Sequence, residues 1–221
     1  MTQVSELIGD TSNQQWSEAQ IQDRIQKAQE QFVVDTRALT DTQTFSIVSG
    51  TNTYDLSDDT FDIIRVGISG HSALKKFSKF DLDLSVGGDW STRNGPPSHY
   101  FVDTTSTNKK LTLFPIPQGN DAGTNNLVAE YVKVPPILTG DSDSPLNGQP
   151  LLIPYLDALA YYAASQILFA SNDQTQWAKG RLMLDQYRSK VSDCKEGFNA
   201  LSQTTPLRMR LYGVGRSVNA R

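Results

Sequence analysis

The sequence predicts an α+β protein: a helical core of about three long helices, one N-terminal and two C-terminal, with an inserted antiparallel β-sandwich or barrel-like module and an extended C-terminal arm. Three observations predict this class. Apolar residues recur at helical spacing near both ends of the 221-residue chain, short β-like runs alternate with turn signals between them, and the last segment alternates apolar and basic residues. Because a lone helix cannot bury its apolar stripe, we expect the N-terminal helix to pack on the C-terminal pair.

The N-terminal part, residues 1–41, is predicted to hold an arm and a core helix. The first fifteen residues are polar, and we expect them to fray. Ser17 and Gln20 have the spacing of a capping box, and apolar residues then recur at helical spacing as far as Leu39. The sequence therefore predicts a helix over 17–38. Its outer face is expected to carry five polar residues: Gln22, Asp23, Gln26, Gln29 and Glu30.

Residues 42–136 are predicted to form the inserted β-module. Turn signals rich in Gly, Pro, Asn and Asp recur at short intervals, which is typical of a sandwich or barrel. The β-like runs between these turns are 44–48, 52–56, 62–68, 73–77, 98–103, 111–114 and 127–134. A short helix is expected over 78–86, because Leu82 and Val86 lie one helical turn apart.

Residues 137–202 are predicted to form a loop and two core helices. Pro154 fits the first turn of the earlier helix. The later helix is expected to begin near Asn172 or Asp173. Its apolar or small residues follow a heptad seam: Trp177, Gly180, Leu184, Tyr187, Val191, Cys194 and Phe198. Gly180 on this seam would let the two helices approach closely.

Composition excludes several classes of protein. With one cysteine, Cys194, and two histidines, His71 and His99, the chain has no basis for a disulfide framework, a cysteine-based zinc site or a histidine-rich metal site. Polar residues interrupt the most apolar stretch, 151–170, and residues 1–10 lack the features of a signal peptide. We therefore expect no membrane span, no metal and no cofactor, and synthesis in the cytoplasm.

Charge and polar residues are unevenly distributed. The net charge is −4, but residues 204–221 hold four arginines and no acid, which leaves −8 on the rest of the chain. An acidic body is a poor general DNA binder, because phosphate contacts need clustered cations. Ser, Thr, Asn and Gln together number 67, so the surface is expected to be built from hydroxyls and amides more than from charges.

Three patterns that bear on chemistry are better explained as turns. Residues 67–71 resemble a nucleophile elbow, but position 71 is His where the pattern needs Gly. The loop that begins at Asp141 lacks the glutamate of a calcium-binding EF-hand. Asp55, Asp58, Asp59 and Asp62 flank a turn, where aspartate commonly caps the backbone. No catalytic residue is therefore expected, and the protein is not predicted to be an enzyme.

The C-terminal arm, residues 203–221, carries the most informative pattern. Apolar and basic residues alternate strictly over 207–211, so the apolar side chains would share one face of a strand and the arginines the other. Docking on a neighbouring protein would be strand addition. A tail that returns to its own β-module, or a loose terminus, is an equal alternative. The candidate interface residues are Pro206, Leu207, Arg208, Met209, Arg210, Leu211, Tyr212 and Arg216.

Ordered short motifs suggest a family. They are the runs 53–56, 63–66, 95–97 with Tyr100, 113–117, Tyr131 with 134–138, and the Ala- and Tyr-rich 158–167. In this order they resemble the head-to-tail adaptor (connector) proteins of tailed bacteriophages, over about residues 16–190. Each motif alone is unspecific, whereas their order and spacing are more informative.

The resemblance implies a structural protein of the virion neck, assembled in the host cytoplasm. It implies a homo-oligomeric ring, commonly of twelve copies, that binds the portal protein and the tail or next neck protein. The ring would extend the channel through which DNA is ejected without sequence-specific binding, and the C-terminal arm would reach the portal. The alternative is a glycan-binding β-module of a phage tail or surface protein, in which Trp90, Tyr100 and Tyr54 would stack on sugars.

Overall fold

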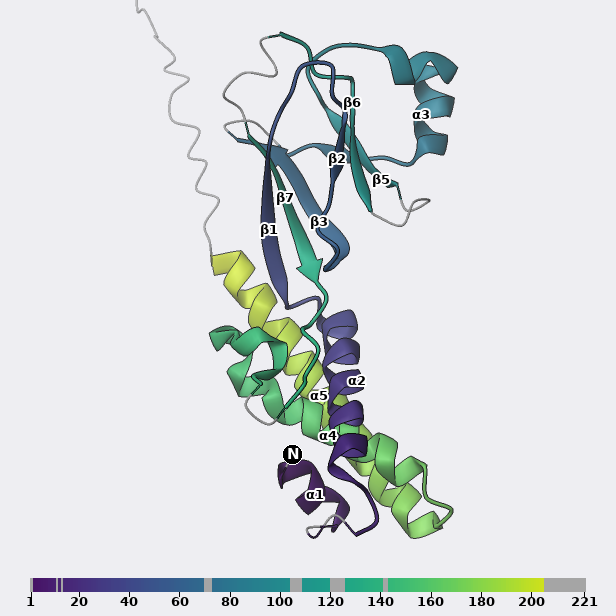
Figure 1. Ribbon diagram of the computed structural model, residues 1–221, viewed down its shortest axis with the longest axis vertical. Helices are drawn as coiled ribbons and strands as arrows, with labels where there is room; N and C mark the ends of the chain where they lie inside the picture. Colours follow the sequence, from purple (N-terminus) through teal and green to yellow (C-terminus); the bar gives the residue numbers. More distant parts are fainter. Residues whose placement is uncertain are drawn as a thin grey trace, which may run out of the picture.

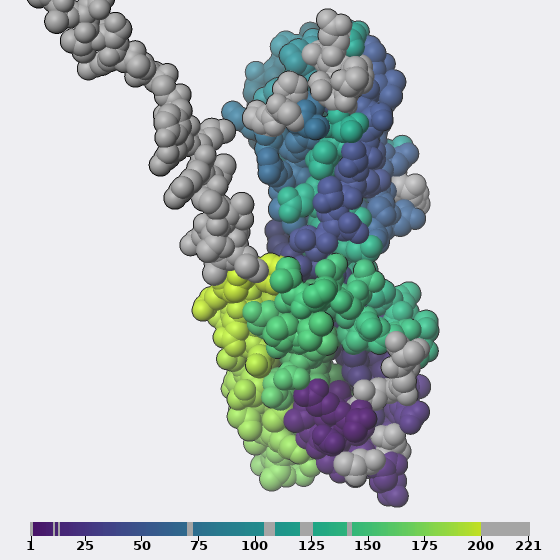
Figure 2. Space-filling view, turned by 90° about the vertical axis from the view of Figure 1, so that its left-hand side faces the viewer, coloured from purple at the N-terminus to yellow at the C-terminus, as the bar shows by residue number. Residues whose placement is uncertain are grey.

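The computed structural model describes residues 2–10, 12, 14–69, 73–103, 109–119, 126–140 and 143–204, and it confirms the predicted α+β class. Helices from both ends of the chain pack together at one end of an elongated molecule, and two β-sheets form the other end (Figure 1). Figure 2 shows these two parts stacked end to end. All of the strands lie between α2 and α4 in the sequence, so the chain leaves the helical part once and returns once.

The helical part is organised around α4. It contains α1 (Thr2–Ile8), α2 (Glu18–Thr36), α4 (Leu156–Phe169) and α5 (Gln174–Thr204), and α4 contacts the other three. The stretch from Pro150 to Phe169, with a mean hydropathy of 1.2, is long and apolar enough to cross a membrane by length and composition alone. Half of it is buried inside the protein, which is the pattern of a central core helix.

The helix α1 corrects the expectation that the first fifteen residues fray. It packs on α4, with the side chain of Val4 only 2% exposed, and Gln3 Nε2 donates to Asp157 Oδ1 at 3.1 Å. The apolar residues of this helix are Val4, Leu7 and Ile8. They span about two turns, which is too short a stretch for helical periodicity to stand out in the sequence.

The helix α2 begins with the predicted capping box. Ser17 Oγ accepts from the Gln20 N–H at 3.4 Å, and Gln20 Oε1 accepts from the Ser17 N–H at 2.9 Å. At the other end Arg37 adopts a left-handed conformation, with φ of 54°. The chain therefore turns sharply and enters the first strand at Thr40.

Gln29 corrects the predicted outer face of α2, because its side chain is completely buried. Its Nε2 donates to the Pro136 carbonyl at 2.6 Å, and its Oε1 accepts from the Leu146 N–H at 3.1 Å. Gln26 Oε1 accepts from the Leu138 N–H at 3.0 Å. These amides satisfy backbone groups of residues 134–149, the return segment, which leads from the last strand back to the helices.

Gln22 completes a row of three amides on α2. Its Nε2 donates to the Leu138 carbonyl at 2.7 Å. Gln22, Gln26 and Gln29 are spaced by four and three residues, so they lie on one face of the helix. This face resembles a solvated surface in the sequence, but in the structure it binds the backbone of the return segment.

The helices α4 and α5 form a hairpin along the predicted seam. Four seam positions are buried: Gly180, Tyr187, Val191 and Cys194. A Cβ atom on Gly180 would lie 3.0 Å from Phe169 Cε1, so the close helix approach expected at this glycine is confirmed. Trp177 differs from the prediction, because it is 48% exposed and its Nε1 donates to the Ser171 carbonyl at 2.5 Å.

The start of α4 also differs from the prediction. Residues Pro150–Tyr155 form a 3-10 helix, η4, and regular α-helix begins only at Leu156. Pro154 has no N–H to donate, which suits the beginning of a helix and not its interior. A shorter 3-10 turn, η3 (Pro145–Gly148), precedes η4 and buries Leu146 against the helical part.

Two sheets form the β-module, which runs from Thr40 to Lys133. The first has the order β1 (Thr40–Ser46), β7 (Asn126–Lys133), β3 (Thr60–Ile68). The second has the order β2 (Thr53–Asp55), β6 (Lys110–Phe114), β5 (His99–Asp103), β4 (Lys75–Lys76). All pairs are antiparallel except β4 and β5, which run parallel and so depart locally from the predicted arrangement.

The two sheets pack face to face as a sandwich. One apolar cluster contains Ile63 and Val66 from β3, Leu111 and Leu113 from β6, and Leu127 from β7. The predicted short helix is present as α3 (Lys79–Val86), and it covers the other face of the second sheet (Figure 1). The central strands β5 and β6 are consequently covered on both faces, which explains why β6 is almost entirely buried.

The contact at Gly180 leads to a test of helix packing. We expect Gly180→Leu to lower the free energy of unfolding by about 1–3 kcal/mol, because the new side chain must displace Phe169. Ala178→Leu places the same side chain at an exposed position of α5 and should change it by less than about 0.5 kcal/mol. Denaturant unfolding compares the two, and equal effects would contradict close packing at the seam.

The buried amide of Gln29 leads to a second test. Gln29→Ala leaves the Pro136 carbonyl and the Leu146 N–H without their partner, so we expect a loss of about 2–4 kcal/mol in the free energy of unfolding. Gln186→Ala, at an exposed site on α5, is the control and should cost less than about 0.5 kcal/mol. A near-neutral Gln29→Ala protein in denaturant unfolding would show that the return segment is held by other contacts.

Candidate interaction surfaces

The predicted C-terminal interface residues lie outside the described part of the chain. They are Pro206, Leu207, Arg208, Met209, Arg210, Leu211, Tyr212 and Arg216. The 31-residue helix α5 carries the chain as far as Thr204 and ends level with the base of the β-module (Figure 1). The described part of the chain therefore ends at the boundary between the helical part and the β-module.

The β-module joins the helical part through β1 and β7, which lie side by side. The Lys133 N–H donates to the Leu39 carbonyl at 2.8 Å, just before β1 begins. Val132 is fully buried and belongs to the same apolar cluster as Phe32 of α2. The two parts thus share a continuous apolar core at this junction.

Three charged side chains, Lys133, Asp41 and Asp59, form an ionic cluster at the junction. Lys133 Nζ lies 3.2 Å from Asp41 Oδ2 and 3.1 Å from Asp59 Oδ2. Hydrogen bonds to Asp59 and Asp41 raise the pKa of Lys133. The Thr42 N–H, followed by Lys133, lowers the pKa of Asp41. Burial by itself would raise the pKa of Asp59, but hydrogen bonds from Ser57 and Lys133 lower it overall, so all three groups are held in their charged forms.

The aspartates between β2 and β3 do not converge on a shared site. Asp55 pairs with Lys110 at 3.6 Å, Asp62 pairs with Arg37 at 3.0 Å, and Asp59 belongs to the ionic cluster of the junction. Paired carboxylates can perform acid–base chemistry only when they face a common substrate. Their separation into different ion pairs agrees with the structural interpretation of these residues.

The other two patterns singled out in the sequence are only partly described. Gly70 and His71 of the elbow-like turn lie outside the described residues, as does Asp141 of the acidic loop. Asp143 Oδ2 accepts from the Thr139 N–H at 2.5 Å, which closes a turn. Across the described residues, no group of three or more His, Cys, Asp or Glu side chains is placed to hold a metal ion.

The three aromatic rings considered for sugar stacking are engaged in packing. Tyr54 and Tyr100 are 8% and 2% exposed. Trp90 meets Phe101 edge-on with ring centroids 5.5 Å apart, and its Nε1 donates to Asp83 Oδ1 at 2.6 Å. Sugar stacking needs an exposed ring face, which the two tyrosines do not offer.

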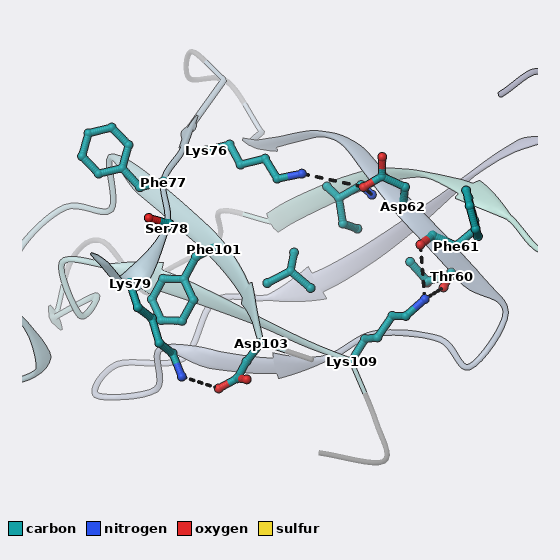
Figure 3. Close-up of a pocket in the computed structure, with 12 residues that line it drawn as sticks. Thr60, Phe61, Asp62, Lys76, Phe77, Ser78, Lys79, Phe101, Asp103 and Lys109 are labelled. Atoms are coloured by element: carbon teal, nitrogen blue, oxygen red, sulfur yellow. Dashed lines mark hydrogen bonds and ion pairs between the residues drawn. The ribbon is translucent and has the colours of Figure 1, made fainter. Parts of the chain in front are cut away.

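A groove of about 510 Å³ lies at one edge of the sandwich, between β3 and β5 (Figure 3). Its volume is in the range of ligand pockets. We call it the lysine groove, because three lysines from separate segments surround it: Lys76, Lys79 and Lys109. Its apolar wall is formed by Phe61, Ile63, Phe77, Phe101 and Val102. Sequence reasoning missed this groove, because no local motif connects the three lysines.

Two of the lysines in the groove have carboxylate partners. Lys79 Nζ lies 2.6 Å from Asp103 Oδ2, and Lys76 Nζ lies 3.7 Å from Asp62 Oδ1 (Figure 3). Asp103 faces Lys79, whereas Asp62 is shared between Lys76 and Arg37, whose Nη2 lies 3.0 Å from Asp62 Oδ2. These pairs are partly exposed, so each adds little to stability.

Lys109 is held differently. Its Nζ donates to the Thr60 carbonyl and to the Phe61 carbonyl, the latter at 3.2 Å, and within the described part of the chain no carboxylate pairs with it. Thr60 is 1% exposed, and its Oγ1 has no hydrogen-bond partner among the described residues. The groove therefore holds an ammonium group that no carboxylate of the described residues compensates.

The helix α3 presents a second apolar surface. Phe80 and Leu84 lie one helical turn apart and are 68% and 71% exposed. On the opposite side of the helix, Leu82 is fully buried. Exposed large apolar side chains that lie side by side often mark a contact surface.

One comparison with known proteins gave a match. A family model described as SU10 adaptor protein matches residues 1–210. This range includes every helix and strand of the described fold. No curated protein matches the chain.

The ionic cluster at the junction leads to a test of pH dependence. The lowered aspartate pKa values add stability that is fully present above the ordinary value of about 4 and is lost as the pH falls through the lowered values. The free energy of unfolding should therefore fall more steeply between pH 4 and pH 2 in the native protein than in Lys133→Gln. Lys27→Gln, which removes an exposed pair on α2, is the control. Identical pH profiles for the native protein and Lys133→Gln would show that Lys133 does not lower the pKa values of the two aspartates.

Proposed function

The chain belongs to the SU10 adaptor protein family, and on that basis we propose that it is a ring-forming head-to-tail adaptor that joins the portal of a bacteriophage to its tail and extends the DNA channel. As a bacteriophage adaptor protein it is a structural component of the virion and interacts with other virion proteins. The observation that carries the proposal is the adaptor family match over the whole described fold. We propose no catalytic role.

The elongated two-part shape supports a position between two neighbours. The helical part and the β-module lie at opposite ends, so each end can contact a different partner (Figures 1 and 2). The exposed pair Phe80 and Leu84 lies on α3 in the β-module, away from the helices. A closed ring forms from heterologous contacts, in which one side of each copy meets the other side of the next. We propose such a ring, of about twelve copies as in similar adaptors.

The charge distribution supports passage of DNA through the ring. Residues outside 204–221 carry a net charge of −8. A channel wall that bound phosphates through clustered cations would hold DNA, whereas an acidic body repels it at short range. We therefore propose that DNA passes through the channel without sequence-specific contacts.

We propose that residues 205–221 bind the portal. This segment contains four arginines and no acid, and in the sequence it follows α5, whose end lies at the boundary between the two parts of the fold. Added as a strand to a partner, it would place Leu207, Met209 and Leu211 on one face and Arg208 and Arg210 on the other.

The location of the chain in the virion provides the main test. We expect electron cryo-microscopy of purified virions to place a ring of this protein between the portal and the tail. Density that assigns the chain to another part of the particle would contradict the adaptor role.

Removal of the arm provides a narrower test. A chain that stops after Thr204 keeps every described helix and strand, so we expect it to fold but to bind purified portal at least about tenfold more weakly. The charge control is Arg181→Glu with Arg188→Glu on the exposed face of α5, which should leave portal binding unchanged. Undiminished binding by the shortened chain, measured by sedimentation or interferometry, would rule out the arm as the contact.

A further inference from the structure

We propose that the lysine groove receives an extended acidic segment of another virion protein, which adds as a strand to the open edge of β5. The inference rests on the proposed function only in supposing that the partner is a neighbour within the virion. It is carried by three features of the groove: a strand edge that no described strand covers, a lysine that no described carboxylate pairs with, and an apolar wall.

The unpaired edge begins where β4 ends. β4 pairs with only the first two residues of β5, His99 and Tyr100, and its ladder finishes with the Phe77 N–H donating to the Tyr100 carbonyl at 2.8 Å. Backbone groups of alternate residues point to the same edge of a strand, so those of Val102 point to where β4 would continue. Beyond Tyr100, no described strand covers this edge. It can therefore accept a further strand.

The lysines of the groove favour an incoming strand that carries negative charge. Lys76 and Lys79 already face Asp62 and Asp103, whereas Lys109 meets only carbonyl oxygens among the described residues. Lys76 shares Asp62 with Arg37, and no described carboxylate pairs with Lys109, so the groove carries an excess of positive charge. An incoming carboxylate would form a charge-assisted hydrogen bond with the Lys109 ammonium group. The basic C-terminal segment of a second copy is disfavoured, because its arginines would meet these lysines.

The apolar wall favours a protein strand over nucleic acid as the occupant of the groove. Phe61 is 41% exposed, and together with Phe101 and Val102 it lines the space between the lysines. An added strand turns every second side chain inward, where apolar residues would cover this wall while carboxylates reach the rim. Phosphate binding depends on several uncompensated cations, whereas two of the three lysines here already face carboxylates. The observations therefore favour an acidic segment of a protein over DNA.

Zero-length cross-linking of purified virions tests the proposal on the assembled protein. A carbodiimide joins lysines to carboxylates that touch them, and mass spectrometry identifies the products. We expect Lys109 to be joined to an aspartate or glutamate of one other virion protein. Lys110, the next residue, pairs with Asp55 of its own chain and is the matched control. Products that join Lys109 only to its own chain, to a second copy or to DNA would overturn the proposal.

Variants then test whether the segment adds as a strand. The probe is a synthetic peptide with the sequence of the cross-linked segment, and the measurement is its dissociation constant for the full-length protein. We expect Lys109→Gln to raise this constant about tenfold and Lys110→Gln to leave it unchanged.

Val102→Pro tests the backbone hydrogen bond between β5 and the added strand without changing a charged side chain. The Val102 N–H points away from β6, so proline at this edge should preserve the melting temperature while it raises the dissociation constant about tenfold. Phe101→Pro, which removes a ladder hydrogen bond to β6, should instead lower the melting temperature. A Val102→Pro protein that binds the peptide as tightly as the native chain would overturn strand addition.

The two proposals fail separately. A ring between portal and tail whose Lys109 forms no cross-link to another protein would refute the acidic strand and leave the adaptor role standing. Conversely, a Lys109 cross-link in a chain that lies elsewhere in the particle would support the groove and refute the adaptor position.

Discussion

The return of the chain from the β-module to the helices depends on side chains for its hydrogen bonds. Much of the return segment runs along α2 without regular secondary structure, so its backbone groups need partners from elsewhere. Gln29 supplies both a donor and an acceptor from a fully buried position, and Gln22 and Gln26 continue the row. This row fixes the return segment on α2 and so positions α4, which completes the helical core.

These amides show that part of the polar composition of the chain serves contacts within the subunit. The excess of Ser, Thr, Asn and Gln predicts a surface built from hydroxyls and amides, yet some of these side chains make contacts inside the subunit. Besides the row on α2, Gln43 Oε1 accepts from the Ser57 N–H at 3.0 Å and links β1 to the turn after β2. Amide side chains carry both a donor and an acceptor, so they can replace backbone pairing where the chain is irregular.

Patterns that are local and repeated could be predicted from the sequence, and features made by tertiary contacts could not. The capping box at Ser17, the seam around Gly180 and the helix around Leu82 each depend on residues within a few turns, and the structure confirms them. Gln29 looked solvent-facing because its partners lie more than a hundred residues away. The lysine groove was missed for the same reason, since strand pairing in the second sheet brings Lys76, Lys79 and Lys109 near one another, and packing of the two sheets adds the β3 wall.

The insertion of the β-module between α2 and α4 has a consequence for the order of folding during translation. The ribosome releases α1 and α2 before the strands, but the main partners of α2, which are α4 and α5, are made only after all of the described strands. The strands lie between Thr40 and Lys133 and need no later residue to pair with one another. The β-module can therefore form while synthesis continues, whereas the apolar stripe of α2 must wait for the last third of the chain. Ile21 and Phe32, fully buried in the finished protein, are among the residues exposed during that interval.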